Sequence, residues 1–205
     1  MKYFDKEASK WDENPIYIER AKVISDEILK SIKVSNNINA LEYGCGTGLL
    51  SFFLYKSLKS IVLMDDSSEM LKIVNNKIKQ NKIKNMKTVK INLIYNRYAN
   101  KHDLIYTLMT LHHIKNTEKI IEIFYSLLNK NGYLCIADLI EEDGSFHKHH
   151  KNYNGHNGFN TEKLKKLLEC KGFSDVKYSI CYEMEKKIDQ NIIRKYPIFL
   201  MIGEK

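Results

Sequence analysis

The chain has 205 residues, of which 43% are hydrophobic and 28% charged, and its formal net charge is +8. This length suits one domain, and the balance of apolar and charged residues excludes a disordered or fibrous chain. No apolar run approaches the roughly 18 residues of a membrane-spanning helix, and residues 1–10 are charged where a secretory signal would be apolar. We therefore expect a cytoplasmic protein without a membrane span.

The positive charge is concentrated between Leu71 and Lys101, where basic residues occur without an acidic one. A basic segment can indicate a nucleic acid partner. This segment has few aromatic residues to stack on bases and is rich in Asn and Ile, so nucleic acid binding is the weaker interpretation. The 4 cysteines show no CxxC spacing, which disfavours disulfides and zinc ribbons.

Short β-rich apolar runs alternate with helical patterns, which is typical of βαβ units around a parallel sheet. In chain order the patterns predict a helix over 15–32, a strand over 38–43, a helix over 49–54, a strand over 60–65, a helix opening at Ser67 and Ser68, strands over 86–93 and 104–107, a helix over 117–130, a strand over 133–137, a helix over 161–171, and strands over 176–182 and 196–202. We expect a single α/β domain over residues 1–205.

The most informative segment runs from Glu42 to Gly48, between a predicted strand and a predicted helix. Its glycines allow backbone N–H groups to approach a ligand at the carboxyl edge of the sheet, although a Gly-rich turn can also be a simple tight connection. Asp65 ends the next strand, where a carboxylate can accept both ribose hydroxyls of a nucleoside, or can serve as a helix-entry residue, a role that Asp66 could share. The glycines run GxGxG rather than GxGxxG, so a nicotinamide dinucleotide is the minority interpretation.

These segments resemble the class I S-adenosylmethionine-dependent methyltransferases, in the small-molecule branch that includes ubiquinone and menaquinone biosynthesis enzymes. The blocks that carry the resemblance are residues 42–48, 63–71, 90–93, 102–107 with 111–114, 131–139, and 141–147 with 158–159. The resemblance implies a Rossmann-like open sheet of seven strands, mostly parallel with the last antiparallel, and helices on both faces. It leaves residues 1–35 as an N-terminal helical cap and residues 139–160 as an insertion on the substrate side.

The resemblance also implies S-adenosyl-L-methionine as the cofactor. Its expected binding residues are Glu42, Gly44, Cys45, Gly46, Gly48, Asp65, Asp66, Met70, Asn92, Leu93 and Thr107. In the family, the acidic residue and glycines of the first motif surround the methionine part, the acid at Asp65 binds the ribose, and a Met such as Met70 packs on the adenine. Asn92 stands where many members carry an acid, and its amide oxygen can accept the same hydrogen bond.

Histidines are the candidate catalytic residues, because a general base is needed when the attacking atom holds a proton. His113 follows the fourth strand and His147 lies in the 139–160 insertion, so both are expected to face the substrate; a structural role in pinning the loop is the alternative for His113. No cysteine or regular ligand spacing supports a metal among the histidines, and no metal is expected. Trp11 is either a lid aromatic over the cofactor or an anchor of the N-terminal helix.

The predicted function is transfer of a methyl group from S-adenosylmethionine to a small-molecule acceptor by in-line displacement. The alternatives are an RNA methyltransferase, an NAD-dependent oxidoreductase and a non-catalytic cofactor-binding protein. The prolines are Pro15 and Pro197, which excludes the base-methylating enzymes that need a Pro-Pro aromatic turn or a Pro-Cys nucleophile. The sequence names neither the acceptor atom nor the oligomeric state.

Overall fold

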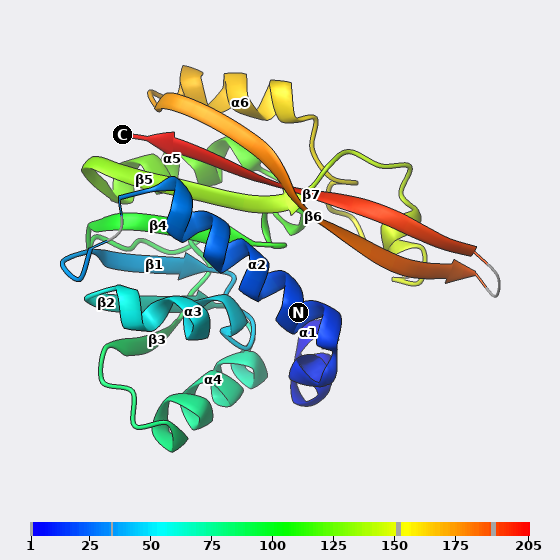
Figure 1. The fold of residues 1–205 in the computed structure, drawn as a ribbon, viewed down its shortest axis with the longest axis horizontal. Coiled ribbons are helices and arrows are strands. Elements are labelled where there is room, and N and C mark those ends of the chain that lie inside the picture. Colours follow the sequence, from blue (N-terminus) through cyan, green and yellow to red (C-terminus); the bar gives the residue numbers. More distant parts are fainter. Residues whose placement is uncertain (1, 34, 151–152, 190–191) are drawn as a thin grey trace.

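The strands form one seven-stranded sheet in the order β3-β2-β1-β4-β5-β7-β6 (Figure 1). The computed structural model describes residues 2–33, 35–150, 153–189 and 192–205. The strands are β1 (Asn39–Tyr43), β2 (Ser60–Asp65), β3 (Met86–Lys90), β4 (His102–Leu108), β5 (Leu128–Leu139), β6 (Ser174–Asp189) and β7 (Ile192–Glu204). β7 runs antiparallel to both of its neighbours, and the pairs among β1 to β5 are parallel. The expected Rossmann-like sheet with an antiparallel last strand is confirmed.

Helices cover both faces of this sheet, as predicted (Figure 1). They are α1 (Lys2–Glu7), α2 (Pro15–Ser31), α3 (Leu49–Leu54), α4 (Ser68–Gln80), α5 (Thr117–Leu127) and α6 (Thr161–Cys170), with short 3-10 helices η1 (Ala8–Glu13), η2 (Tyr55–Ser57), η3 (Leu111–His113) and η4 (Ser145–His147). Side-chain caps fix several starts: Asn14 accepts a hydrogen bond from the N–H of Ile16 ahead of Pro15, and Ser67 accepts one from the N–H of Met70.

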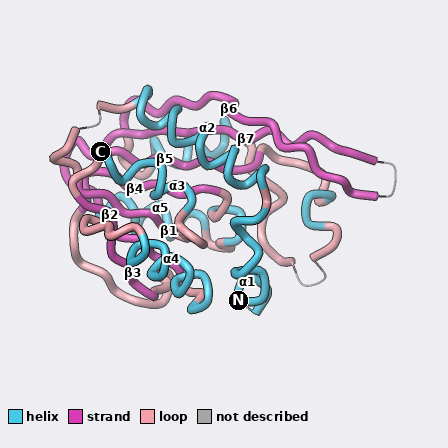
Figure 2. Tube along the Cα trace, turned by 60° about the horizontal axis from the view of Figure 1, so that its bottom comes forward, coloured by secondary structure: helices cyan, strands magenta, loops and turns pink. Residues whose placement is uncertain are grey.

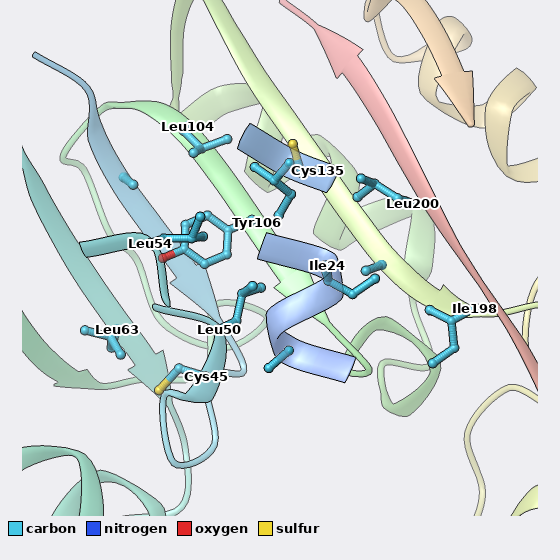
Figure 3. Close-up of a cluster of buried hydrophobic side chains, with 14 of the residues drawn as sticks. Ile24, Cys45, Leu50, Leu54, Leu63, Leu104, Tyr106, Cys135, Ile198 and Leu200 are labelled. Carbon is cyan, nitrogen blue, oxygen red and sulfur yellow. The ribbon is translucent and has the colours of Figure 1, made fainter. Parts of the chain in front are cut away.

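Alternation along the strands divides the core in two. Leu104 and Tyr106 of β4 lie in the cluster that packs against α2 and α3, whereas Ile105 lies in the cluster on the opposite face with α5 and α6. Figure 3 shows the first cluster, in which Tyr106 of β4 lies beside Leu54 of α3. Successive side chains of a strand point to opposite faces, so both faces of a central strand must be apolar to be covered by helices.

The expected helix over 117–130 is too long at its end. α5 stops at Leu127, and Leu128 already belongs to β5, where it is buried and pairs with His102. The Asn131-Gly132 signal marks a bend inside the long strand instead of a helix end, with Asn131 at φ 60° donating its N–H to the carbonyl of Lys205. Tertiary pairing of Leu128 thus overrides the helical pattern.

The last two strands are longer than predicted and form a hairpin that extends past the rest of the sheet (Figures 1 and 2). The segment between β5 and α6 lies beside this hairpin: Ser145 Oγ is 2.7 Å from the hydroxyl of Tyr196, and Lys148 pairs with Asp189 at 3.3 Å. The hairpin therefore holds the 139–160 segment in place.

The strand order reverses direction between β1 and β4, because the chain builds β2 and β3 on one side of β1 and returns to build β4 and β5 on the other. Open α/β sheets bind ligands in the crevice outside the carboxyl ends of the strands at such a point. No helix among the described residues is long and apolar enough to cross a membrane.

Candidate active site

A cavity of about 470 Å³ lies at the carboxyl ends of the central strands. Such a volume is typical of cofactor and small-molecule sites. Its lining combines the turn after β1, the end of β2, the loop after β4 and aromatic residues of the N-terminal helices. Among the residues that line it are Tyr3, Phe4, Trp11, Tyr17, Glu42, Gly44, Cys45, Gly46, Asp65, Asp66, Met70, Asn92, His113 and Tyr153.

The glycine turn after β1 borders this cavity. Gly44 and Gly46 have φ values of 68° and 53°, in the left-handed region that favours glycine. A Cβ on Gly44 would lie 2.1 Å from Cγ2 of Thr110, so this glycine is required by the close approach of the loop after β4. A Cβ on Gly46 would meet no protein atom within 4 Å. Gly46 therefore keeps open a space that belongs to the cavity and not to the protein core.

Asp65 sits at the end of β2 against this turn. Its Oδ2 accepts a hydrogen bond from the N–H of Gly46 at 2.8 Å, and its Oδ1 accepts one from the N–H of Ser67 at 2.9 Å. Burial raises the pKa of the carboxyl above its usual value, against the lowering effect of these backbone bonds. A carboxylate has about four acceptor sites, more than these backbone N–H groups use, so acceptor capacity remains for hydroxyl donors in the cavity.

Glu42 is a buried acid at the end of β1 and also lines the cavity. It accepts a hydrogen bond from the hydroxyl of Ser51, which in turn lies 2.6 Å from the hydroxyl of Tyr106. Burial raises the pKa of Glu42 to about 8, despite the hydrogen bonds from Ser51. A cationic group in the cavity would favour the ionised form of this carboxyl.

The structure brings most of the expected cofactor residues to the cavity, but not all of them. Of the expected residues, those that line the cavity are Glu42, Gly44, Cys45, Gly46, Asp65, Asp66, Met70 and Asn92. Gly48, Leu93 and Thr107 are not among its lining. Leu93 is buried with its N–H bonded to the hydroxyl of Tyr43, Thr107 is buried within β4, and Gly48 with φ 80° precedes α3.

The N-terminal helices close the cavity on one side. Asp12 accepts hydrogen bonds from the hydroxyl of Thr47 and from Nζ of Lys77, the latter at 2.7 Å, and Lys77 also donates to the carbonyl of Thr47 at 2.9 Å. Trp11 lines the cavity and lies against Tyr17 with ring centroids 4.8 Å apart. The aromatic side chains are thus held over the cavity by polar contacts to the glycine turn and α4.

A second, smaller compartment of about 150 Å³ adjoins the first. The two share the wall formed by Tyr3, Phe4, Trp11, Tyr17, Arg20, Met109, His113 and His150. His147 of the 139–160 segment lines the second compartment together with His112. Burial lowers the pKa of His113 to about 2 and that of His147 to about 3, with further lowering by the neighbouring histidines. Both candidate catalytic histidines therefore meet at one place, as neutral imidazoles at physiological pH.

The predicted catalytic residues did not include His112, although it follows the fourth strand beside His113. This buried side chain has its Nδ1 2.5 Å from Oδ1 of Asp138, and its backbone N–H donates to Oδ2 of the same carboxyl at 3.2 Å. Asp138 is 0% exposed at the end of β5. The available signals in the sequence were two adjacent histidines, His112 and His113, and an acid at the end of a strand. Only the fold shows that His112 pairs with Asp138.

The second residue that sequence reasoning missed is Arg20 of α2, which is 5% exposed and lines both compartments. Its Nη1 donates to Sδ of Met184 at 3.6 Å, its guanidinium lies 4.9 Å from the ring centroid of Tyr17, and its Nε has no hydrogen-bond partner among the described residues. Burial lowers the pKa of Arg20 to about 10. The charge of Asp138 raises this pKa, but by less than burial lowers it, and a buried cation without a directly paired carboxylate is costly unless a ligand compensates it.

An open α/β sheet with a glycine turn, a carboxylate at the end of β2 and a cavity between them fits a nucleoside ligand. Residues 34–195 match the family described as methyltransferase domain, and this match spans most of the chain. The chain belongs to the methyltransferase domain family. The expected class, a methyltransferase, is thereby confirmed at the level of the family.

Two curated relatives agree with this assignment. The chain is 28% identical over 140 residues to an uncharacterized methyltransferase of Schizosaccharomyces pombe, covering 63% of this chain and 49% of the relative. It is 30% identical over 133 residues to a ubiquinone biosynthesis O-methyltransferase of Pelagibacter ubique, covering 62% of this chain and 53% of that protein. The chain thus spans about half the length of the curated relatives it matches.

Solved structures share the fold. The N-methyltransferase NodS of Bradyrhizobium japonicum, determined in complex with S-adenosyl-L-homocysteine, superposes with a TM-score of 0.74 at 17% identity, covering 100% of this chain and 97% of NodS. The YcgJ protein of Bacillus subtilis gives a TM-score of 0.76 at 12% identity, covering 89% and 97%. Sequence identities this low support a shared fold and nothing more specific.

Proposed function

We propose that this protein transfers the methyl group of S-adenosylmethionine to a small-molecule acceptor held in the second compartment. The observation that carries the proposal is the pair of adjoining cavities of about 470 and 150 Å³, which share a wall at His113. The volume of the larger cavity is typical of a cofactor site, and the smaller cavity has room for a small molecule or a part of one. An acceptor atom there lies next to the cofactor compartment, as in-line displacement requires.

The residues proposed to hold the cofactor are those of the predicted set that line the larger cavity: Glu42, Gly44, Cys45, Gly46, Asp65, Asp66, Met70 and Asn92. Asp65 accepts the ribose hydroxyls, and Met70 packs on the adenine. The cationic methionine part lies near Glu42, where its charge favours the ionised carboxyl. Gly48 shapes the turn into α3, while Leu93 and Thr107 support the site from behind.

The proposal is tested with methyl-labelled S-adenosylmethionine and fractions of a cell extract. Label is expected in the dialysable fraction, with stoichiometric release of S-adenosylhomocysteine. Label in the RNA fraction alone would overturn the small-molecule acceptor in favour of the RNA alternative. No label in any fraction, in a protein that binds S-adenosylhomocysteine, would favour a non-catalytic cofactor-binding protein.

The N-terminal helices are expected to act as a lid. In Asp12→Ala the contacts to Thr47 and Lys77 are lost, so the lid opens more readily and the affinity for S-adenosylhomocysteine falls about fivefold, or about 1 kcal/mol. Asp26→Ala is the control, because its exposed pair with Lys22 lies within α2 and touches neither cavity. Calorimetric titration measures both; equal affinities in the two variants would leave Trp11 and its neighbours as anchors only.

The charge of the second compartment favours an anionic acceptor. Its lining, as far as the structure describes it, contains Arg20 and Lys186 and no acidic residue.

Arg20→Met removes a buried cation without emptying its space, so we expect the melting temperature to rise by about 2–4 °C, the effect of about 1 kcal/mol. Arg194→Met, which removes an exposed cation paired with Asp143, is the control and should not raise it. A lower melting temperature for Arg20→Met would assign this side chain a structural role.

A further inference from the structure

Three of the histidines that line the second compartment lie close together, namely His112, His113 and His147. His112 and His113 lie on η3, and His147 ends η4, so two segments far apart in the sequence supply them. The ring centroids are 4.1 Å apart for His112 and His113, 5.1 Å for His112 and His147, and 5.6 Å for His113 and His147. One ring nitrogen from each lies within 4.8 Å of those of the other two.

The arrangement around His112 orients one nitrogen for a ligand. Its Nδ1 is engaged by the buried Asp138, which also accepts the backbone N–H of His112 and therefore fixes both the ring and the turn. A carboxylate at Nδ1 leaves Nε2 as the free acceptor. Metal-bound histidines almost always have such a partner on the other ring nitrogen.

His147 adds an independent observation. Its Nδ1 is buried and has no hydrogen-bond partner among the described residues. The ring is fixed by stacking on Tyr153, with centroids 3.5 Å apart and planes 4° from parallel. A buried imidazole nitrogen held in one orientation without a partner is costly in an empty protein, and a metal ion bound there would remove this cost.

We propose that His112, His113 and His147 bind one divalent transition-metal ion, of which zinc fits best, and that its open fourth position takes the attacking atom of the acceptor. Three imidazoles with one open position are the ligand set of catalytic zinc sites. Zinc–nitrogen bonds of about 2.0–2.1 Å in tetrahedral geometry put ligand nitrogens roughly 3.4 Å apart. The three nitrogens, which lie within 4.8 Å of one another, therefore move closer together on binding.

This site deepens the proposed function, on which its chemical role rests. A hydroxyl or thiol of the acceptor that coordinates the ion loses its proton to water, because the ion stabilises the anion. The lone pair of that oxygen or sulfur forms the new bond to the methyl carbon. The bond between this carbon and the sulfonium sulfur breaks, and its electron pair stays on sulfur, which gives S-adenosylhomocysteine and the methylated acceptor.

The test measures metal binding directly, with zinc chloride as the probe. Chelator-treated full-length protein is dialysed against zinc and the bound metal is quantified; one equivalent is expected at micromolar zinc. His147→Ala and His113→Ala should each lower the affinity at least tenfold, and Asp138→Asn should lower it about 10–100-fold. His149→Ala removes an exposed histidine that lines the same compartment but lies outside the three-histidine cluster, so it is the matched control and should bind zinc like the unaltered protein.

Cobalt(II) gives a second readout that does not depend on any variant. Bound to the unaltered protein, it should show the intense visible absorption of tetrahedral coordination and be displaced by zinc. Absence of stoichiometric zinc, or equal zinc affinity in His147→Ala and the unaltered protein, would overturn the site. A protein that binds S-adenosylhomocysteine but no zinc would reject the metal site alone. A protein that binds zinc but no S-adenosylhomocysteine would reject the proposed function, while the metal site would stand.

Discussion

Gly46→Val is expected to abolish measurable binding of S-adenosylhomocysteine in a protein that still folds. A Cβ at Gly46 meets no protein atom within 4 Å, and this residue lines the larger cavity. The added side chain therefore enters space that the cofactor needs and clashes with the ligand rather than with the protein. The backbone cost of a side chain at φ 53° is about 1–2 kcal/mol, which a folded domain tolerates.

Two further variants separate ligand exclusion from backbone strain. Gly46→Ala carries a smaller side chain and should retain weak binding, at least about tenfold below that of the unaltered protein. Gly144→Ala introduces a side chain at a φ of 87°, before η4 and away from the larger cavity, so its backbone cost is similar. Calorimetry and thermal unfolding are the measurements. Unchanged affinity in Gly46→Val would show that the cofactor lies elsewhere.

Asp65→Ala should lower the affinity for S-adenosylmethionine and S-adenosylhomocysteine by at least about tenfold. The carboxylate has acceptor sites left after its bonds to Gly46 and Ser67, and hydrogen bonds to a charged group contribute about 1.5–3 kcal/mol each. Asp65→Asn keeps an oxygen for one of the two backbone bonds and sets its NH2 group against the other N–H, so it should fold with a small loss of stability and bind more weakly. Asp26→Ala on α2 is again the control.

The pH dependence of this binding follows from the same carboxyl. Burial raises the pKa of Asp65, so the carboxylate form is lost at a higher pH than for an ordinary Asp. The affinity for S-adenosylhomocysteine should fall a first time as the pH drops through about 8, where Glu42 becomes protonated, and a second time as the pH drops through the raised pKa of Asp65. In Asp65→Ala the second fall should be absent. An identical profile in both proteins, together with unchanged affinity, would remove Asp65 from the cofactor site.

Local sequence patterns sufficed for the elements that position the cofactor site. The strand before the glycine turn, the cap at Ser67 and the acid at the end of β2 depend on residues close in sequence, and the structure has them as predicted. A carboxylate directly after a parallel strand must lie at the carboxyl edge of the sheet, whatever the rest of the fold does. Asp65 could therefore be placed before the structure was known.

Features that depend on distant residues could not be predicted in this way. The pairing of His112 with Asp138 requires the register of η3 against the end of β5, and the burial of Arg20 requires α2 to lie beside β6, where Met184 contacts it. The end of α5 at Leu127 follows from strand pairing with His102, which no helical pattern contains. Tertiary contacts decide each of these features, and no local pattern separates a charged helical residue that becomes buried, such as Arg20, from an exposed one.

The most direct test of the central claim is calorimetric titration of the purified protein with S-adenosylhomocysteine, with NADH as the control, because it needs no knowledge of the acceptor. The account predicts micromolar binding of S-adenosylhomocysteine at one site per chain and no binding of NADH. Binding of NADH alone, or of neither ligand, would contradict it.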